Sequence, residues 1–209
     1  MAPPRAFEHR SDAGRRLAAV VDGLGPEGLV LGLARGGVPV AAELARAHGV
    51  ALDVLVVRKV GHPAQPEYAL GAVSEDGVVW GEELPGEEVA AQLERAGVQA
   101  LALRRGRPRA PVAGRAVVLV DDGLATGQSM LAAVRSVVGA GAATVRVAVP
   151  VASGPGLAAV AALCPAEAVL VVEPPDFHAV GQFYDDFTQV EDETVAGLLA
   201  GDAGPEQHR

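Results

Sequence analysis

The sequence predicts an α/β protein in which a mostly parallel sheet lies between two layers of helices. Short apolar runs, such as residues 29–34 and 117–120, lack polar alternation, which is typical of strands buried on both faces of a parallel sheet. Each of these two runs is followed by a glycine-containing loop and then by apolar residues at helical spacing. Strands that alternate with helices favour right-handed crossovers and a three-layer α/β/α sandwich.

Length and composition favour one domain. The chain has 209 residues, half of them hydrophobic, and we expect residues 1–200 to form the domain and residues 201–209 a disordered tail. The single cysteine, Cys164, cannot form an intramolecular disulfide, and the chain opens without a signal-peptide pattern. No apolar run reaches the roughly 20 residues that span a bilayer. We therefore expect a cytoplasmic protein with no membrane partner.

The net charge of −9 is unevenly distributed along the chain. Residues 1–146 contain 16 basic and 16 acidic residues, whereas residues 147–208 contain ten acids and neither Lys nor Arg. Binding to nucleic acid depends on Lys and Arg that neutralise phosphates. The acidic balance therefore argues against a nucleic-acid partner.

The first expected helix begins near Asp12, and the first strand, residues 29–34, ends at Arg35. Gly36 and Gly37 follow, and a helix is expected over residues 38–47. Two glycines allow backbone N–H groups to approach an anion, and Arg35 adds a charge-assisted donor. Taken alone, the same letters would also suit an ordinary tight turn with an exposed arginine.

The second strand, residues 52–57, leads directly into Arg58 and Lys59. Arg outnumbers Lys by sixteen to one in this chain, so the single Lys59 indicates a need for a compact point charge. The plainer alternative is a solvated start of a loop. Further along, apolar residues 69–73 and 78–80 flank a turn signal and predict a hairpin. A helix is expected over residues 87–103, and the arginines that follow it are interpreted as structural or solvated: Arg104, Arg105 and Arg107.

The most informative stretch is residues 116–130, AVVLVDDGLATGQSM. A buried strand ends at Asp121 and Asp122, and a loop of small residues leads to Thr126-Gly127 and a helix. Free N–H groups and the helix dipole at such a helix start bind phosphate. Carboxylates at the end of the strand can accept hydrogen bonds from sugar hydroxyls or hold Mg²⁺ through water. The stretch predicts a site for a ribose 5-phosphate.

Two other interpretations of this stretch fit it less well. A hydrophobic strand that ends in two acids also occurs in nucleoside triphosphatases, but the chain has no GxxxxGK[ST] motif, because its only lysine precedes Val60. A purely structural strand, turn and helix would not need two acids, Thr-Gly and a hydroxyl residue together. The remaining elements are a strand at residues 144–149, a helix at 156–163, a strand at 168–172 and a closing helix at 191–199.

The stretch VVLVDDGLATGQS resembles the signature of the type I phosphoribosyltransferases, and the resemblance covers most of the chain. It implies a six-stranded sheet in the order 3-2-1-4-5-6, with strand 3 antiparallel. It also implies that Asp121 and Asp122 bind the ribose hydroxyls of phosphoribosyl pyrophosphate, together with Mg²⁺. The residues that would hold the 5-phosphate are Gly123, Leu124, Ala125, Thr126, Gly127 and Ser129.

The same resemblance assigns the diphosphate to the Arg35-Gly36-Gly37 loop, with Arg58 and Lys59 as further cations. Residues 60–76 match the place of the family's flexible loop, which closes over the substrate and excludes water. Glu67 in that loop is the candidate general acid or base. The catalytic residues implied by the resemblance are Arg35, Lys59 and Glu67.

In this family a variable hood, built here from the N-terminal residues and residues 173–192, covers the crevice and recognises the base. Phe183, Tyr184 and Phe187 are candidates for stacking on it, with Phe7 as a neighbour. The alternative, favoured for two of the three, is that these rings form the core of the hood itself. A lone His178 in such a loop is more often a surface residue than a catalyst.

The resemblance implies transfer of ribose 5-phosphate to a nucleobase or related acceptor with release of pyrophosphate, in nucleotide metabolism. Ala125 stands where relatives that act on 6-oxopurines carry an acid, and LATG is closer to adenine and uracil enzymes, so the acceptor stays open. The alternatives are a noncatalytic regulatory protein that binds phosphoribosyl pyrophosphate or a nucleotide, and a hydrolase of a phosphorylated ribose compound. A homodimer is left open as the assembly.

Overall fold

The computed structural model of the chain describes residues 6–62, 65–164, 166–172 and 177–201. The predicted disordered tail lies outside the described residues except for Gly201, and residues 173–176 of the hood also lie outside them. No helix in the described ranges combines the length and the apolar character that crossing a membrane requires.

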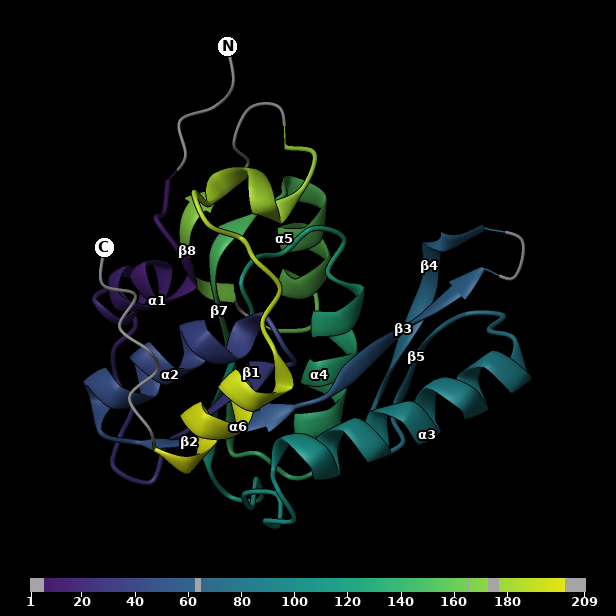
Figure 1. Ribbon diagram of the computed structural model, residues 1–209, viewed down its shortest axis with the longest axis horizontal. Coiled ribbons are helices and arrows are strands. Elements are labelled where there is room, and N and C mark those ends of the chain that lie inside the picture. Colours follow the sequence, from purple (N-terminus) through teal and green to yellow (C-terminus); the bar gives the residue numbers. More distant parts are fainter. Residues whose placement is uncertain (1–5, 63–64, 165, 173–176, 202–209) are drawn as a thin grey trace.

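A parallel sheet of five strands forms the centre of the molecule (Figure 1). Its strand order is β2-β1-β6-β7-β8, and each neighbouring pair is parallel. The five residues of β1 are all buried, as expected from an apolar run without alternation. The bounds are β1 Leu29–Leu33, β2 Ala51–Leu55, β6 Ala116–Val120, β7 Thr144–Ala152 and β8 Ala166–Val172.

A second sheet is antiparallel and projects from the main body (Figure 1). It contains β3 (Val57–His62), β4 (Gln65–Ser74) and β5 (Val79–Gly81), in that order. The prediction of one six-stranded sheet is therefore not confirmed: the expected antiparallel strand at 69–73 is part of β4 and pairs with β3 and β5.

The reason for this difference lies in the chain's local connections. Only Val56 separates β2 from β3, so the chain passes from one sheet into the other almost without a break. Antiparallel strands joined by a short connection pair directly, and β4 therefore pairs with β3 rather than with the edge of the main sheet. For the same reason most of residues 60–76, predicted as a flexible loop, is strand. Residues 63–64 lie outside the described part.

Helices cover both faces of the parallel sheet, as the three-layer prediction requires. On one face, α1 and α2 pack through Leu17 and Leu44 against Val30 and Val118 of the sheet. On the other face, α4 and α5 contribute buried residues to a core with Leu31 and Leu119. The bounds of these four helices are α1 Arg10–Ala18, α2 Gly37–His48, α4 Gln128–Gly139 and α5 Gly154–Ala161.

The remaining helices lie beside this sandwich. Helix α3 (Gly86–Leu103) runs along the antiparallel sheet (Figure 1), and α6 (Asp192–Ala200) contacts both α2 and α3. Val195 of α6 is fully buried in a cluster with Val38 and Ala100. A short 3-10 helix, η1 (Val180–Phe183), belongs to the hood. The C-terminal part of the chain thus returns to the side of the molecule where α2 begins.

Helix α1 begins two residues earlier than expected. His9 is its N-cap, and the His9 Nδ1 atom accepts a hydrogen bond from Asp12 N at 3.1 Å. Asp12, expected at the start of the helix, lies instead in its first turn, where its carboxylate accepts from Glu8 N at 3.2 Å. The register matters because it places Arg10 at the first helical position.

Candidate functional site

Two loops meet at the carboxyl ends of β1 and β6, which are neighbours in the parallel sheet. The first loop (residues 34–37) lacks side chains where it approaches the second loop (residues 121–127). A Cβ atom on Gly37 would lie 2.5 Å from the carbonyl oxygen of Val120 and 2.8 Å from the Cα atom of Asp121. A Cβ atom on Gly36 would collide with the carboxylate of Asp122. Only glycine permits this approach.

Asp121 and Asp122, hereafter the acid pair, follow the last residue of β6. The Asp121 Oδ1 atom accepts a hydrogen bond from Asp122 N at 2.8 Å. Burial, and after it the negative charge of Asp122, raises the pKa of Asp121 well above its ordinary value. Burial also raises the pKa of Asp122, although Arg10 opposes that shift. The acid pair is therefore a site that favours binding of a cation or of hydroxyl donors.

Arg10 supplies positive charge at the acid pair, and sequence reasoning did not identify it. Its Nε atom donates to Asp122 Oδ2 at 2.8 Å, and its NH1 group donates to the carbonyl of Thr188 at 2.8 Å. Several arginines occur near the start of the chain, and no spacing or motif distinguishes this one. Its role depends on the fold, which brings the first turn of α1 to the end of β6.

The second loop is fixed by backbone hydrogen bonds to the end of β7. Leu124 N donates to Val151 O at 2.8 Å, and Ser153 N donates to Leu124 O at 2.8 Å. The Ser153 hydroxyl also donates to the carbonyl of Ala125 at 2.5 Å. These bonds hold the loop in one shape without using the hydroxyl of Thr126, which is exposed.

Helix α4 begins immediately after this loop. Gly127, at φ 79°, is its N-cap and supplies no side-chain hydrogen bond to the first turn. The N–H groups at a helix start have no partner within the helix, and here no capping side chain competes for them. With exposed Thr126 and half-buried Ser129, the start of α4 presents the donor set that an anion requires.

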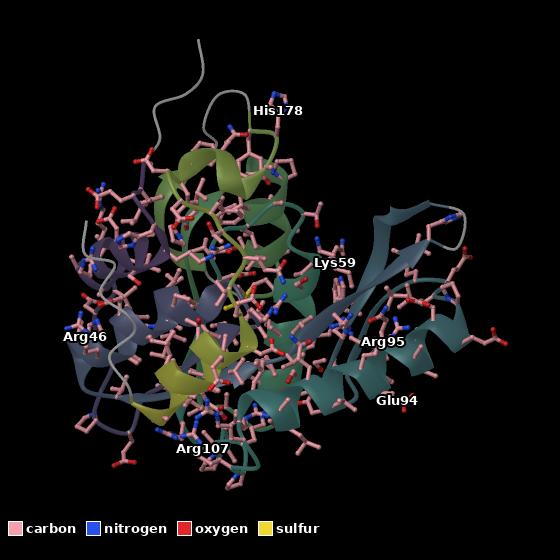
Figure 2. All side chains as sticks on the ribbon, in the orientation of Figure 1. Arg46, Lys59, Glu94, Arg95, Arg107 and His178 are labelled. Atoms are coloured by element: carbon pink, nitrogen blue, oxygen red, sulfur yellow. The ribbon has the colours of Figure 1, made fainter. Side chains whose placement is uncertain are left out.

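Lys59 and Arg58 point in opposite directions because they are consecutive residues of β3. Lys59 is exposed and faces the main body (Figure 2), where its charge lowers the pKa of Asp121. Arg58 donates to Gln92 Oε1 at 2.6 Å and to Gln99 Oε1 at 3.1 Å, both on α3. The structure brings Lys59 toward the acid pair and holds Arg58 on the opposite face of the strand.

Arg35 of the first loop reaches the C-terminal helix. Its NH1 group lies 3.2 Å from Asp192 Oδ1, in the first turn of α6. The Asp192 side chain is 55% exposed, and an ion pair of this kind stabilises a protein by about 0–1 kcal/mol. The guanidinium is therefore held weakly, and an anion bound beside the first loop can compete for it.

Residues 8–177 match the family model described as the phosphoribosyl transferase domain. The chain belongs to the phosphoribosyl transferase family. The loops that the structure brings together, 34–37 and 121–127, both lie within the matched range, as do Arg10 and Lys59. The family resemblance predicted from the strand, acid pair and Thr-Gly is thus confirmed.

Two curated proteins of Mycobacterium tuberculosis, "Putative phosphoribosyl transferase MT0597" and "Putative phosphoribosyl transferase Rv0571c", are each 44% identical to this chain over 207 residues. The alignment covers 93% of this chain and 46% of each relative, so the chain spans about half their length. The crystal structure of TT1426 from Thermus thermophilus has 46% identity and a TM-score of 0.80, over 95% of this chain and 99% of that one.

A purine phosphoribosyltransferase from Pyrococcus horikoshii has the same fold at 17% identity, with a TM-score of 0.52 over 87% of this chain and 93% of that chain. At this identity the likeness concerns the fold alone. The shared fold accounts for the sandwich and identifies no substrate of this chain.

The aromatic residues of the hood form a small core. Phe183 and Tyr184 are each 2% exposed and pack with Phe7, whose ring centroid lies 5.3 Å from that of Tyr184. Phe187 is half-buried, and the Arg10 guanidinium lies 3.9 Å above the centroid of its ring. The alternative in which the rings form the core of the hood is the one that matches this arrangement.

Backbone pairing holds the two segments of the hood together, and side-chain contacts of Arg10 and Tyr184 join the hood to the acid pair. Phe7 N donates to Phe183 O at 3.0 Å, and Asp185 N donates to Phe7 O at 2.9 Å. The Tyr184 hydroxyl donates to the carbonyl of Asp122 at 2.6 Å, and burial raises the Tyr184 pKa above its ordinary value. His178 is exposed. The side chain of Glu67, predicted as an acid or base, lies outside the described residues, although its backbone belongs to β4.

The acid pair provides part of the donor set that Mg²⁺ requires. Within the described ranges no group of three or more His, Cys, Asp or Glu side chains could enclose a metal ion. Mg²⁺ usually binds through one or two carboxylates and completes its shell with water and substrate phosphates. Two half-buried carboxylates beside a loop with free backbone donors fit that pattern, so Asp121 and Asp122 could hold the ion together with a phosphorylated substrate.

Proposed function

We propose that this chain transfers ribose 5-phosphate from phosphoribosyl pyrophosphate to a nucleobase or related acceptor, with release of pyrophosphate. The observation that carries the proposal is the close approach of Gly36 and Gly37 to the acid pair. Through this approach the first loop, with Arg35, faces the acid pair and the second loop. Both lie at the carboxyl edge of the sheet, where ligands of such folds bind. One phosphorylated sugar with a diphosphate can contact both loops at once.

In the proposed complex, Asp121 and Asp122 accept hydrogen bonds from the ribose hydroxyls. The 5-phosphate lies at the start of α4, where Thr126, Ser129 and free backbone N–H groups donate to it. Backbone N–H groups at Gly36 and Gly37 and the Arg35 guanidinium bind the diphosphate, for which Arg35 leaves Asp192. The carboxylates thus bind the hydroxyls of the donor, and the N–H groups and Arg35 bind its phosphates.

The chemical step in this proposal is displacement of pyrophosphate at the anomeric carbon. Negative charge develops on the departing diphosphate, and fixed donors placed around it lower the barrier. Arg35 and Lys59 supply positive charge that stabilises the diphosphate, and Mg²⁺, when bound at Asp121 and Asp122, would supply more. Arg58 would take part only after exchanging its hydrogen bonds to α3. Glu67 is the proposed general acid or base.

Binding of the donor tests the first half of the proposal. Calorimetry with phosphoribosyl pyrophosphate should show binding that depends on Mg²⁺ and is lost when Asp121→Asn is combined with Asp122→Asn. A matched control combines Glu82→Gln with Glu83→Gln, which removes the same charge from two exposed residues between β5 and α3. The control should bind like the unchanged protein. No binding by the unchanged protein, or equal binding by the double Asn variant, would contradict the proposal.

Release of pyrophosphate tests the second half. The protein is incubated with phosphoribosyl pyrophosphate, Mg²⁺ and a panel of purines, pyrimidines and related acceptors, including adenine and uracil. Release with one acceptor identifies the reaction. Donor binding without release for any acceptor would instead favour the noncatalytic regulatory protein.

A further inference from the structure

Arg10 lies where the acid pair, the first loop and the hood meet. Its Nε atom donates to Asp122 Oδ2 at 2.8 Å, and a Cβ atom on Gly36 would lie 3.3 Å from the same Nε. The side chain is 11% exposed. A guanidinium this enclosed has few alternative positions, so Arg10 restricts the orientation of the Asp122 carboxylate.

The other contacts of Arg10 are with the hood. Its NH1 group donates to the carbonyl of Thr188 at 2.8 Å, and its guanidinium lies 3.9 Å from the ring centroid of Phe187. The Phe187 ring packs against Tyr184, with centroids 5.0 Å apart, and the Tyr184 hydroxyl donates to the carbonyl of Asp122 at 2.6 Å. The contacts thus form a ring of four residues, in which each residue touches the next: Arg10, Phe187, Tyr184 and Asp122.

We propose that Arg10 is a positioning residue that orients Asp122 and joins it to the hood, so that donor binding at the acid pair and ordering of residues 186–190 are coupled. The donor half of this inference rests on the proposed function. Arg10 binds Oδ2 of Asp122, which leaves Oδ1 to accept from a ribose hydroxyl. Coupling between two sites is reciprocal. A donor that fixes Asp122 therefore stabilises the hood, and a loosened hood weakens donor binding.

Arg16 offers a matched control on the same helix. Its guanidinium lies 2.9 Å from Asp12 Oδ2, its NH1 group donates to the carbonyl of Ala6 at 2.9 Å, and its guanidinium carbon lies 5.6 Å from the ring centroid of Phe7. These are the same three kinds of contact that Arg10 makes, also with the hood. The difference is that the carboxylate partner of Arg16 is Asp12, and not a member of the acid pair.

The first measurement is the dissociation constant for phosphoribosyl pyrophosphate with Mg²⁺, obtained by calorimetry. Arg10→Met should raise it about tenfold, as expected for loss of one hydrogen bond between charged groups, and Arg16→Met should leave it unchanged. Arg10→Lys keeps the charge and should recover part of the affinity. In the Asp122→Asn background Arg10→Met should have little further effect, because Arg10 acts through Asp122. Equal effects of Arg10→Met in the two backgrounds, or of Arg10→Met and Arg16→Met, would overturn the inference.

The second measurement needs no donor. Hydrogen exchange of the backbone amides in residues 186–190 should become faster in Arg10→Met and also in Asp122→Asn, and stay unchanged in Arg16→Met. Unchanged exchange in either of the first two variants would overturn the coupling of Arg10, Asp122 and the hood. Failure of the unchanged protein to bind the donor would refute the proposed function, and the exchange comparison would still decide the coupling.

Discussion

Tyr184 donates its hydroxyl hydrogen to the backbone carbonyl of Asp122 across 2.6 Å. The bond joins the hood, near the end of the chain, to the first residues after β6, and the Tyr184 side chain is buried. It fixes the carbonyl of Asp122 by a contact that is separate from those of the first loop. The hood therefore contributes to the geometry of the acid pair.

Tyr184→Phe should lower the free energy of unfolding by about 1–3 kcal/mol, because it leaves the Asp122 carbonyl without this donor in a buried place. Chemical denaturation measures the change. Phe183→Leu is the companion variant, since it reduces buried aromatic volume in the same core and keeps the hydrogen bond. If Tyr184→Phe has no effect on stability while Phe183→Leu does, the hydrogen bond contributes nothing and only the packing of the rings matters.

Gly37→Ala should destabilise the protein and abolish donor binding. The added methyl group would lie 2.5 Å from the carbonyl of Val120, so the first loop must move away from the end of β6. Thermal unfolding and calorimetry with phosphoribosyl pyrophosphate measure the two effects.

Gly97→Ala is the control for this substitution. Gly97 lies inside α3, and a methyl group added there would meet no atom within 4 Å, so alanine should raise stability by about 0.5–1 kcal/mol. Donor binding should stay the same. Normal stability and binding of Gly37→Ala would show that the close approach of the loops is not required.

Arg104 joins the end of α3 to the base of the antiparallel sheet. Its side chain is 7% exposed, and its nitrogen atoms lie 2.9 Å from Asp53 Oδ1 and 2.6 Å from Glu75 Oε1. Arg104→Met would leave Asp53 buried without its cation and Glu75 with only Arg109, 3.8 Å away, and should lower the free energy of unfolding by about 3–5 kcal/mol. Denaturant titration measures the loss.

The neighbouring residue supplies the comparison for this prediction. Arg105 pairs with Glu193, and both side chains are more than half exposed. Arg105→Met should therefore change stability by no more than about 1 kcal/mol. The sequence pattern does not distinguish these two arginines, since both are interpreted from it as structural or solvated. Similar losses from both variants would contradict the distinction drawn from burial.

The parts of the site that follow from local sequence could be predicted. A β-strand followed by Asp121 and Asp122, and a glycine loop after β1, are fixed by residues adjacent in the chain. The adjacency of β1 and β6 follows from the fold. The sequence predicts Arg58 and Lys59 just after the strand at 52–57, whereas both belong to β3, whose alternation points them in opposite directions. Which of them faces α3 depends on packing between distant elements, and no local pattern contains that information.

The role of Arg10 and the pairing of β3 with β4 could not be predicted in this way. The partners of Arg10, Asp122 and Thr188, are 112 and 178 residues away along the chain. The stretch around Pro63 and Pro66 contains strand-breaking residues, which favour a loop, although most of it pairs as β3 and β4. Side-chain contacts at large separations, and strand pairing against local propensity, are decided by the tertiary fold.

Asp121→Asn should stabilise the protein at neutral pH while it weakens donor binding. Burial, and after it the charge of Asp122, raises the pKa of Asp121 above the ordinary value of 3.8. A carboxyl group whose pKa is higher in the folded state favours folding when it is protonated and opposes folding when it is ionised. Its contribution to stability therefore falls as the pH rises through 3.8 toward the folded-state pKa.

The asparagine variant cannot ionise, and its amide oxygen can still accept the hydrogen bond from Asp122 N. Its gain in unfolding free energy over the unchanged protein should be absent below the ordinary pKa of 3.8 and should grow as the pH rises above it. Denaturant titration without Mg²⁺ across this range measures the difference, with exposed Glu82→Gln as the control that shows no such trend. A gain independent of pH, or a loss at neutral pH, would mean that the folded protein does not oppose ionisation of Asp121. The expected result would mean that ionisation of Asp121 lowers the stability of the folded protein.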